Sequence, residues 1–377
     1  MDRFLLLIFI FVIFLTTESY SQLDMSGRYT HAKFDTAKQD DLLFRLESNI
    51  FFKNNEYFNE YLEGYTLPGF SLRPEIVYYA GTKLRFTAGV SMVYFSGDKG
   101  LFDVKPVISA NLRASDKFNI IFGSLKGNIH HRLIEPLYDP DNQYLRPVEN
   151  GFQFLFDTYR FNFDLWLDWE QFISWGDTIP ERFTVGFRGD VTLTKKGSRV
   201  DVSLPLQALV NHQSGQISDH HADTYSMMNG VAGIKAGLKT GEGFIRKVWL
   251  TGYYLGFSQF SGSLDLGFES GQAFYPVAGF DYKYGQFMAG YWYADDFYSL
   301  KGNPGFMSVS NFQDFYSKYR KMGTLKATFY RSFMDDQIRF NVCVNGYFDI
   351  SANIFDYSYG LSLIYTPDFK IINVKSR

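Results

Sequence analysis

The feature that most constrains this chain is an alternation of polar and apolar residues, with a period of two, that recurs in segments of about ten residues. Residues 160–171 read RFNFDLWLDWEQ, where Phe163 and Leu165 stand on either side of Asp164. Successive side chains of a β-strand point to opposite faces, so the segment predicts one apolar and one acidic surface. A helix would scatter both sets around its axis, and the alternation therefore predicts a strand.

Segments of this kind fill the chain after its N-terminus, and we count about sixteen. Because their ends are not sharply defined, a count of roughly 14 to 18 fits the sequence. They are 42–53, 70–80, 83–95, 102–113, 118–126, 151–159, 161–171, 182–194, 199–212, 227–239, 244–257, 271–282, 286–294, 320–332, 337–348 and 355–365. About ten residues is the length of a tilted strand that crosses a bilayer.

The connectors between these segments alternate between long and short. The long set includes 54–69, 127–150, 213–226, 258–270 and 295–319, and the short set includes Ala80–Lys83, Ala114–Lys117, Tyr159–Phe161, Lys195–Ser198, Thr240–Gly243, Tyr282–Gln286 and Ser332–Gln337. Long extracellular loops and short periplasmic turns are typical of outer-membrane barrels. The fold class predicted is all-β, a transmembrane antiparallel barrel with both termini in the periplasm.

The N-terminus predicts export. The apolar run Phe4–Leu15 is short for a membrane span and normal for the core of a signal peptide, and Ser19-Tyr20-Ser21 offers a cleavage site. We therefore expect a signal peptide at 1–21, a short periplasmic segment at 22–40, the barrel at 41–365 and a tail at 366–377. The single cysteine, Cys343, allows no intramolecular disulfide. The predicted location is the outer membrane of a Gram-negative cell.

In a barrel, the apolar face of each strand meets lipid and the polar face lines the lumen. About sixteen strands leave room for a water-filled channel. The predicted pore-lining residues are Arg45, Arg73, Arg85, Lys105, Arg113, Asp164, Asp168, Glu170, Arg182 and Arg188. The first five would form a basic wall facing an acidic one, although the same charges could serve as structural ion pairs.

On this pattern, which covers residues 41–365, the chain resembles the porin-like bacterial outer-membrane β-barrel proteins. The resemblance implies passive or weakly selective passage of small hydrophilic solutes, with outer-membrane lipid around the wall and a homotrimer as one possible assembly. The chain departs from such barrels after Tyr365, because the tail TPDFKIINVKSR follows the last aromatic strand.

Two loops hold four of the six histidines, namely His130 and His131, then His220 and His221 beside Asp219 and Asp223. Adjacent histidines diverge on an extended backbone, so we predict loop histidines without a metal, and the chain without a cofactor. Loop 127–150 suits an inward-folded constriction, an external lid or simple packing over the rim.

An enzymatic alternative rests on the residues NHQSG at 211–215. His212 and Ser214 share the apolar face of their strand, which places an imidazole near a hydroxyl. The stretch resembles the H-x-S-N-G element of outer-membrane phospholipases and lipid A deacylases, with Gly215 in place of the asparagine. Asn229, the nearest downstream orienting group, shares a face with Lys235 and is predicted to point inward. The resemblance implies a lipid acyl hydrolase using His212 and Ser214, but without a third group we expect no enzyme.

A non-conducting barrel whose loops bind a protein partner is a further alternative, with 295–319 as the candidate loop. A net charge of −3 and a pI near 6.1 give no indication of a basic surface that would bind nucleic acid.

Overall fold

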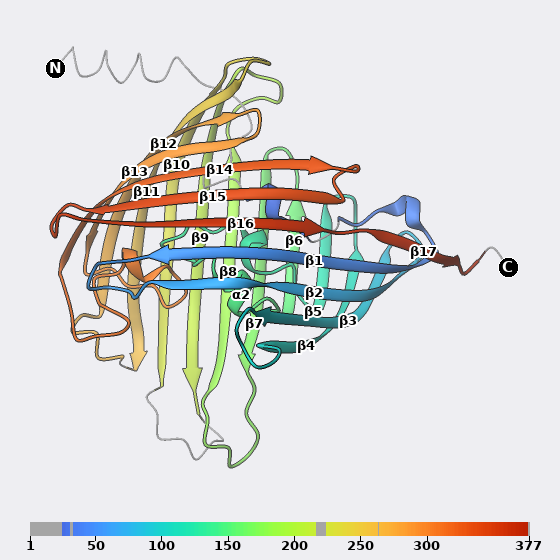
Figure 1. Ribbon diagram of the computed structural model, residues 1–377, viewed down its shortest axis with the longest axis horizontal. Helices are drawn as coiled ribbons and strands as arrows, with labels where there is room; N and C mark the ends of the chain where they lie inside the picture. The colour runs from blue at the N-terminus through green and yellow to red at the C-terminus, as the bar shows by residue number, and fades with distance from the viewer. Residues whose placement is uncertain (1–24, 31–32, 216–223, 263, 376–377) are drawn as a thin grey trace.

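The computed structural model describes residues 25–30, 33–215, 224–262 and 264–375. These residues form one continuous antiparallel sheet that closes on itself (Figure 1). In the view of Figure 1, the strands of the two walls cross, as the strand tilt of a barrel requires. No helix in the described part of the chain has the length and apolar character needed to cross a membrane. The expected signal peptide at 1–21 lies outside the described residues.

The strands are β1 (Asp41–Glu56), β2 (Tyr65–Ala80), β3 (Leu84–Phe95), β4 (Asp103–Arg113), β5 (Phe118–Ser124), β6 (Asn150–Asp157), β7 (Phe161–Gln171), β8 (Glu181–Thr192), β9 (Val200–Ser214), β10 (Tyr225–Lys239), β11 (Ile245–Gly262), β12 (Ser270–Tyr282), β13 (Gly285–Asp295), β14 (Tyr319–Phe333), β15 (Ile338–Asp349), β16 (Ile354–Tyr365) and β17 (Asp368–Asn373). The short helices are η1 (Ser26–Arg28), η2 (Thr36–Lys38), η3 (Asn128–His131), α2 (Asn142–Leu145) and η4 (Pro304–Phe306).

The ring closes where the first strand meets the last two. Residues Ser48–Glu56 of β1 pair with β16, and residues Asp41–Arg45 pair with β17, so β16 and β17 share one position in the wall. The barrel is therefore 16-stranded, and the predicted fold class is confirmed. The segment after Tyr365, expected as a tail, continues the wall as far as Asn373 because it pairs with β1.

The two faces of the wall divide as the alternation predicts. In β3, Arg85, Thr87 and Ser91 are buried inside the barrel, while Phe86 is exposed on the outside. The exposed outer residues include phenylalanine, leucine, isoleucine and tyrosine around the whole ring. This apolar outer surface matches a lipid environment, and the long loops mark the outer end of the barrel.

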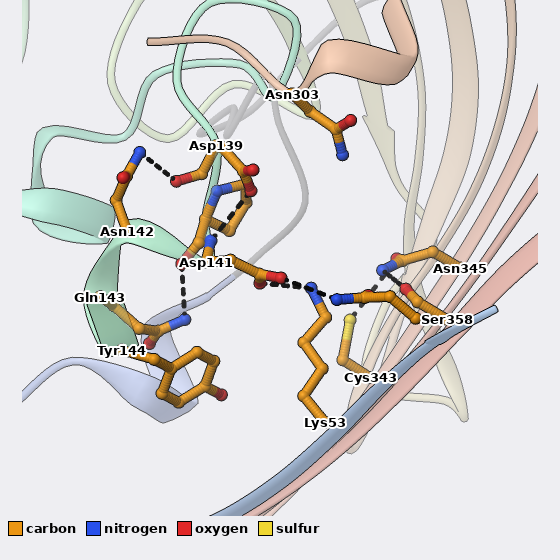
Figure 2. A network of polar contacts seen from close by, with 12 residues as sticks. Lys53, Asp139, Asp141, Asn142, Gln143, Tyr144, Asn303, Cys343, Asn345 and Ser358 are labelled. Carbon is orange, nitrogen blue, oxygen red and sulfur yellow. Dashed lines mark hydrogen bonds and ion pairs between the residues drawn. The ribbon is translucent and has the colours of Figure 1, made fainter. Parts of the chain in front are cut away.

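The lumen is filled in its middle by the loop at 125–149, which folds inward after β5. Asp141 of this loop forms an ion pair with Lys53 of β1 and accepts hydrogen bonds from Asn55 Nδ2 at 3.1 Å and from the Tyr65 hydroxyl at 2.7 Å. Figure 2 shows Asp141 and Lys53 pointing toward each other across the interior. On the opposite side, the backbone N–H of Ile134 donates to Gln207 of β9 at 2.9 Å. These contacts tie the loop to both walls.

Two further segments share the interior. The loop at 296–318 bonds to the first loop, with Asp139 N donating to the Lys301 carbonyl at 2.7 Å. At the other end, Met25 of the N-terminal segment is buried in the main apolar cluster, and Phe34 packs edge-on against Tyr79 with 5.3 Å between ring centroids. Met25 and Phe34, from a segment expected to lie in the periplasm, therefore pack inside the barrel.

Candidate active site

The outer ends of β8, β9 and β10 bring a histidine and a serine together on the lipid-facing surface. His212 of β9 lies directly opposite Ser226 of β10 in the strand register, and its Nδ1 is 2.8 Å from Ser226 Oγ. An imidazole within hydrogen-bond distance of a hydroxyl is the arrangement by which a base activates a nucleophile. The sequence predicted the base, but paired it with Ser214 on the same strand.

A second polar contact adjoins the first. Ser214 Oγ donates to Glu181 Oε2 of β8 over 3.3 Å, and the two residues are partners in the strand register. His212 and Ser214 share the outward face, as their phase predicts, yet each meets a group from a different neighbouring strand. Antiparallel pairing brings residues directly opposite one another closer than residues two apart on one strand, which explains both contacts.

Aromatic residues surround this cluster. The Phe183 ring lies 4.9 Å from the His212 ring and 5.4 Å from Trp169. The neighbouring loop at 172–180 carries Trp175, which is 87% exposed, and Phe172, which is 73% exposed. An imidazole and two hydroxyls thus sit within an apolar rim, where an acyl chain would be favourably accommodated.

A second histidine cluster lies inside the lumen. His131 of η3 is fully buried, with Nδ1 2.8 Å from Asp164 and Nε2 2.8 Å from Glu149. Its ring stacks on Trp166 with 3.5 Å between centroids, and the Tyr138 hydroxyl donates to Glu149 at 2.5 Å. Asp164 also accepts a hydrogen bond from Gln153 Nε2.

Burial opposes the charge on His131, but Asp164 and Glu149 outweigh it and raise the pKa of His131 to about 9. For Glu149, burial is likewise outweighed by His131, so that its pKa falls to about 2. His131 is therefore protonated at neutral pH, with both nitrogens occupied. A histidine in this state is a structural ion-pair partner and has no lone pair with which to accept a proton.

The predicted pore-lining residues meet partners within the barrel. Their contacts join Arg45 to Asp368 (2.6 Å), Arg73 to Glu75 (2.6 Å), Arg85 to the Lys33 carbonyl (3.3 Å), Lys105 to Asp103 (3.6 Å), Arg113 to Asp116 (2.6 Å), Asp168 to the backbone N–H of Asn150 (2.9 Å), Glu170 to Lys301 (2.5 Å), Arg188 to Asp190 and Asp164 to His131. Arg182 faces the same side of the wall. A role of these residues in solute passage stays a prediction.

Asn229 is fully buried and donates to the Tyr298 carbonyl at 2.7 Å inside the barrel, so it cannot orient His212 on the outside. Among the residues that the structure describes, no group of three or more His, Cys, Asp or Glu side chains could hold a metal ion. His220 and His221 lie outside the described residues.

The chain is similar to solved structures of outer-membrane proteins. OprD from Pseudomonas aeruginosa is 11% identical, with 94% of this chain and 98% of that chain covered and a TM-score of 0.51. OccAB4 from Acinetobacter baumannii is also 11% identical, with 89% and 100% covered and a TM-score of 0.49. No curated protein matches the chain. The likeness to OprD shows the fold, and the chain is a porin-like β-barrel of the outer membrane.

Within that class, the chain belongs to the lipid A 3'-O-deacylase-type family, whose model matches residues 34–374. The sequence-based expectation that the chain is not an enzyme is therefore wrong, because this is an enzyme family. That expectation depended on a missing third group near His212 and Ser214. It overlooked Ser226 and Glu181, which lie on other strands and carry no recognisable motif, although the pairing of β8, β9 and β10 could have suggested both.

Proposed function

We propose that the protein is an outer-membrane lipid acyl hydrolase that cleaves an acyl ester of lipid A from the lipid-facing side of the barrel. The observation that carries the proposal is the 2.8 Å contact between His212 Nδ1 and Ser226 Oγ on the outward face. The family to which the chain belongs supports it. The outer end of the wall is also where a lipid of the outer leaflet would present its ester bonds.

The proposed reaction is acyl transfer through Ser226. His212 takes the Ser226 proton as Oγ attacks the ester carbonyl carbon, and the protonated imidazole then gives that proton to the departing alkoxide of the glycolipid. An acyl-enzyme remains on Ser226. Water, deprotonated by His212, hydrolyses this ester and releases a fatty acid, which restores the serine.

Two neighbours would assist this chemistry. The Phe183 ring limits rotation of the His212 imidazole, a task that a carboxylate performs in Ser-His-Asp triads. Glu181 holds Ser214 through the 3.3 Å hydrogen bond, so that Ser214 is a polar neighbour of the ester and the second candidate nucleophile.

The test is a comparison of serine variants in purified, refolded protein. Fatty acid release from lipid A in mixed micelles is measured by mass spectrometry for Ser226→Ala, Ser214→Ala and His212→Ala. Ser258→Ala is the matched control, because Ser258 of β11 lies opposite Met228 and is exposed near the same end of the wall. We expect Ser226→Ala and His212→Ala to lose activity by about 10³-fold or more and Ser214→Ala by about tenfold or less.

The other outcomes are equally informative. Loss in Ser214→Ala with retention in Ser226→Ala would assign the nucleophile to Ser214, as the sequence suggested. Full activity in all three variants would overturn the proposal, since a hydrolase of this kind cannot work without its base.

Passage of small hydrophilic solutes is the second candidate, favoured by a polar cavity of about 640 Å³ at the periplasmic end of the lumen. The inward loops at 125–149 and 296–318 oppose it. Planar-bilayer conductance distinguishes the two states: stepwise ohmic openings that shift toward anion selectivity when Asp164, Asp168 and Glu170 are neutralised would support passage, and a silent bilayer with folded protein would oppose it.

A further inference from the structure

The periplasmic half of the lumen contains a cavity of about 640 Å³ that no step of the proposed hydrolysis uses. Its walls are the periplasmic ends of β4 to β9, and the inward-folded η3 segment separates it from the middle of the lumen. Turn residues such as Asp116, Thr158 and Lys196 stand at its rim. A volume of this size lies within the range of about 300–1,000 Å³ typical of small-molecule sites.

The charges of this cavity are unbalanced. Its charged and histidine lining residues are Lys33, Arg113, Asp116, Lys126, His130, His131, Arg132, Asp157, Asp164, Arg188, Asp190 and Lys196. Three of the carboxylates are already matched, because Asp116 pairs with Arg113, Asp190 with Arg188 and Asp164 with His131. The lining holds six lysine and arginine side chains against four carboxylates, so the cavity carries an excess of positive charge.

The cations at the inner end of the cavity are held in place. The backbone of Lys126 exchanges two hydrogen bonds with the Gln153 amide of β6, at 2.9 and 3.0 Å. The Arg132 guanidinium lies 5.4 Å above the Tyr29 ring, and the His130 ring lies 5.0 Å from the same ring. Tyr29 belongs to the N-terminal segment, so the lumenal loop and that segment together fix this group before any ligand arrives.

The electrostatics of Lys126 agree with this geometry. Burial, together with the nearby Arg132 and Lys33, lowers the pKa of Lys126 to about 8 and outweighs the opposite effect of Asp164. Among the described residues, Lys126 forms no ion pair with a carboxylate. A buried ammonium beside other cations is stabilised by an anion that enters between them.

We propose that this cavity is a binding site for a small soluble anion with at least two negative charges, carried by carboxylate or phosphate groups, that enters from the periplasm. Lys126 and Arg132 would contact the anion at the inner end, and Lys33 and Lys196 would attract it from the rim. The site is separate from the outward-facing His212 and Ser226, and its test does not depend on the outcome of the hydrolase proposal.

Isothermal titration calorimetry on the full mature chain in a non-ionic detergent tests this site, with citrate and pyrophosphate as probes and maltose as the neutral comparison. We expect one-to-one binding of at least one anion, weakened by salt, and none of maltose. Binding of citrate alone would mark a carboxylate site, and binding of pyrophosphate alone a phosphate site. Absence of both would overturn the proposal.

Variants of Lys126 locate the binding. Lys126→Met keeps the length of the side chain without its charge and should weaken binding at least about tenfold, whereas Lys126→Arg should restore most of it. Lys99→Met is the matched control, because Lys99 is an exposed lysine in an outer loop. Equal affinity in Lys126→Met and the wild type, or equal losses in Lys126→Met and Lys99→Met, would overturn the assignment. The heat-dependent gel shift of a folded barrel confirms that each variant has folded.

Discussion

His131 inside the barrel and His212 outside it both contact oxygen atoms, but they differ in what surrounds them. His131 is fully buried, stacked on Trp166 and held by two carboxylates. His212 is partly exposed, packs on Phe183 and meets one hydroxyl. Because both nitrogens of His131 are held by carboxylates, its proton is fixed and its role is structural. His212 contacts one hydroxyl, so its imidazole can exchange a proton with a substrate.

The largest expected effect comes from substituting each histidine, which separates the proposed catalytic role of His212 from the structural role of His131. His212→Ala should lower fatty acid release by about 10³-fold and change the free energy of unfolding by less than about 1 kcal/mol. His131→Leu should destabilise the protein by about 3–5 kcal/mol, because Glu149 and Asp164 lose the charge between them. Activity assays and guanidinium unfolding of both variants check this. Equal losses of stability in the two variants would contradict the comparison.

The next effect is a pH dependence that only the interior histidine should produce. The pKa of His131 is raised to about 9 from its usual 6.5, so its stabilisation is complete below about pH 6.5 and is lost as the pH rises through 9. The loss is about 3 kcal/mol at most. The pKa of Glu149 is lowered to about 2, so the ion pair between His131 and Glu149 also loses its stabilising effect as the pH falls from about 4.5 toward 2.

Thermal unfolding measured from pH 5 to 10 should therefore show a decline in Tm above pH 6.5 in the wild type. His131→Leu removes the titrating group and should flatten this decline. A slope that persists in the variant would assign the pH dependence to other groups.

A smaller effect concerns the support beneath His131. A Cβ added at Gly186 of β8 would lie 2.1 Å from Trp166 Cζ2, so only glycine leaves room for the indole that stacks on His131. Gly186→Ala should destabilise the protein by about 1–3 kcal/mol through this overpacking. Gly230→Ala on β10 is the control, since a Cβ there meets open space. The free energies of unfolding of the two variants should differ clearly.

The smallest effect concerns the outer histidine. Phe183→Ala removes the ring beside His212 and should lower kcat by about tenfold with little change in KM, because the imidazole is less well oriented. Steady-state kinetics on lipid A micelles measure this. An effect confined to KM would instead indicate that Phe183 binds the acyl chain.

Much of the fold follows from local pattern. Three predictions depend only on residues that are close in sequence, and the structure confirms each of them. They are the alternation around Asp164, the long and short connectors, and the assignment of the β3 side chains to the inner or outer face. The segment after Tyr365 differs from expectation because Thr366-Pro367 interrupts the alternation, although the pairing resumes at Asp368. The sequence left the placement of the loop at 125–149 open between the interior, an external lid and the rim. Its inward position depends on contacts with Lys53 and Gln207, which lie on strands distant in sequence.

The candidate site was harder to predict for the same reason. The phase of β9 correctly placed His212 and Ser214 on the outer face, but a single strand cannot show which residues of β8 and β10 stand opposite. Ser226 is an ordinary serine in the sequence, and only the pairing of β9 with β10 brings its hydroxyl to the imidazole.

The closure of the ring by β1 has a consequence for how the chain is assembled. Ser48 pairs with Tyr365, and Asp41 with Asn373, so the final seam joins residues from opposite ends of the polypeptide. Pairings so distant in sequence form slowly, since nearly the whole chain must be ordered before they are gained. Until then both seam strands present unsatisfied edges, and the segment that carries Met25 and Phe34 can enter the interior from the side. Once the seam forms, that segment is enclosed, which makes joining of the two ends the step that commits the barrel to its native state.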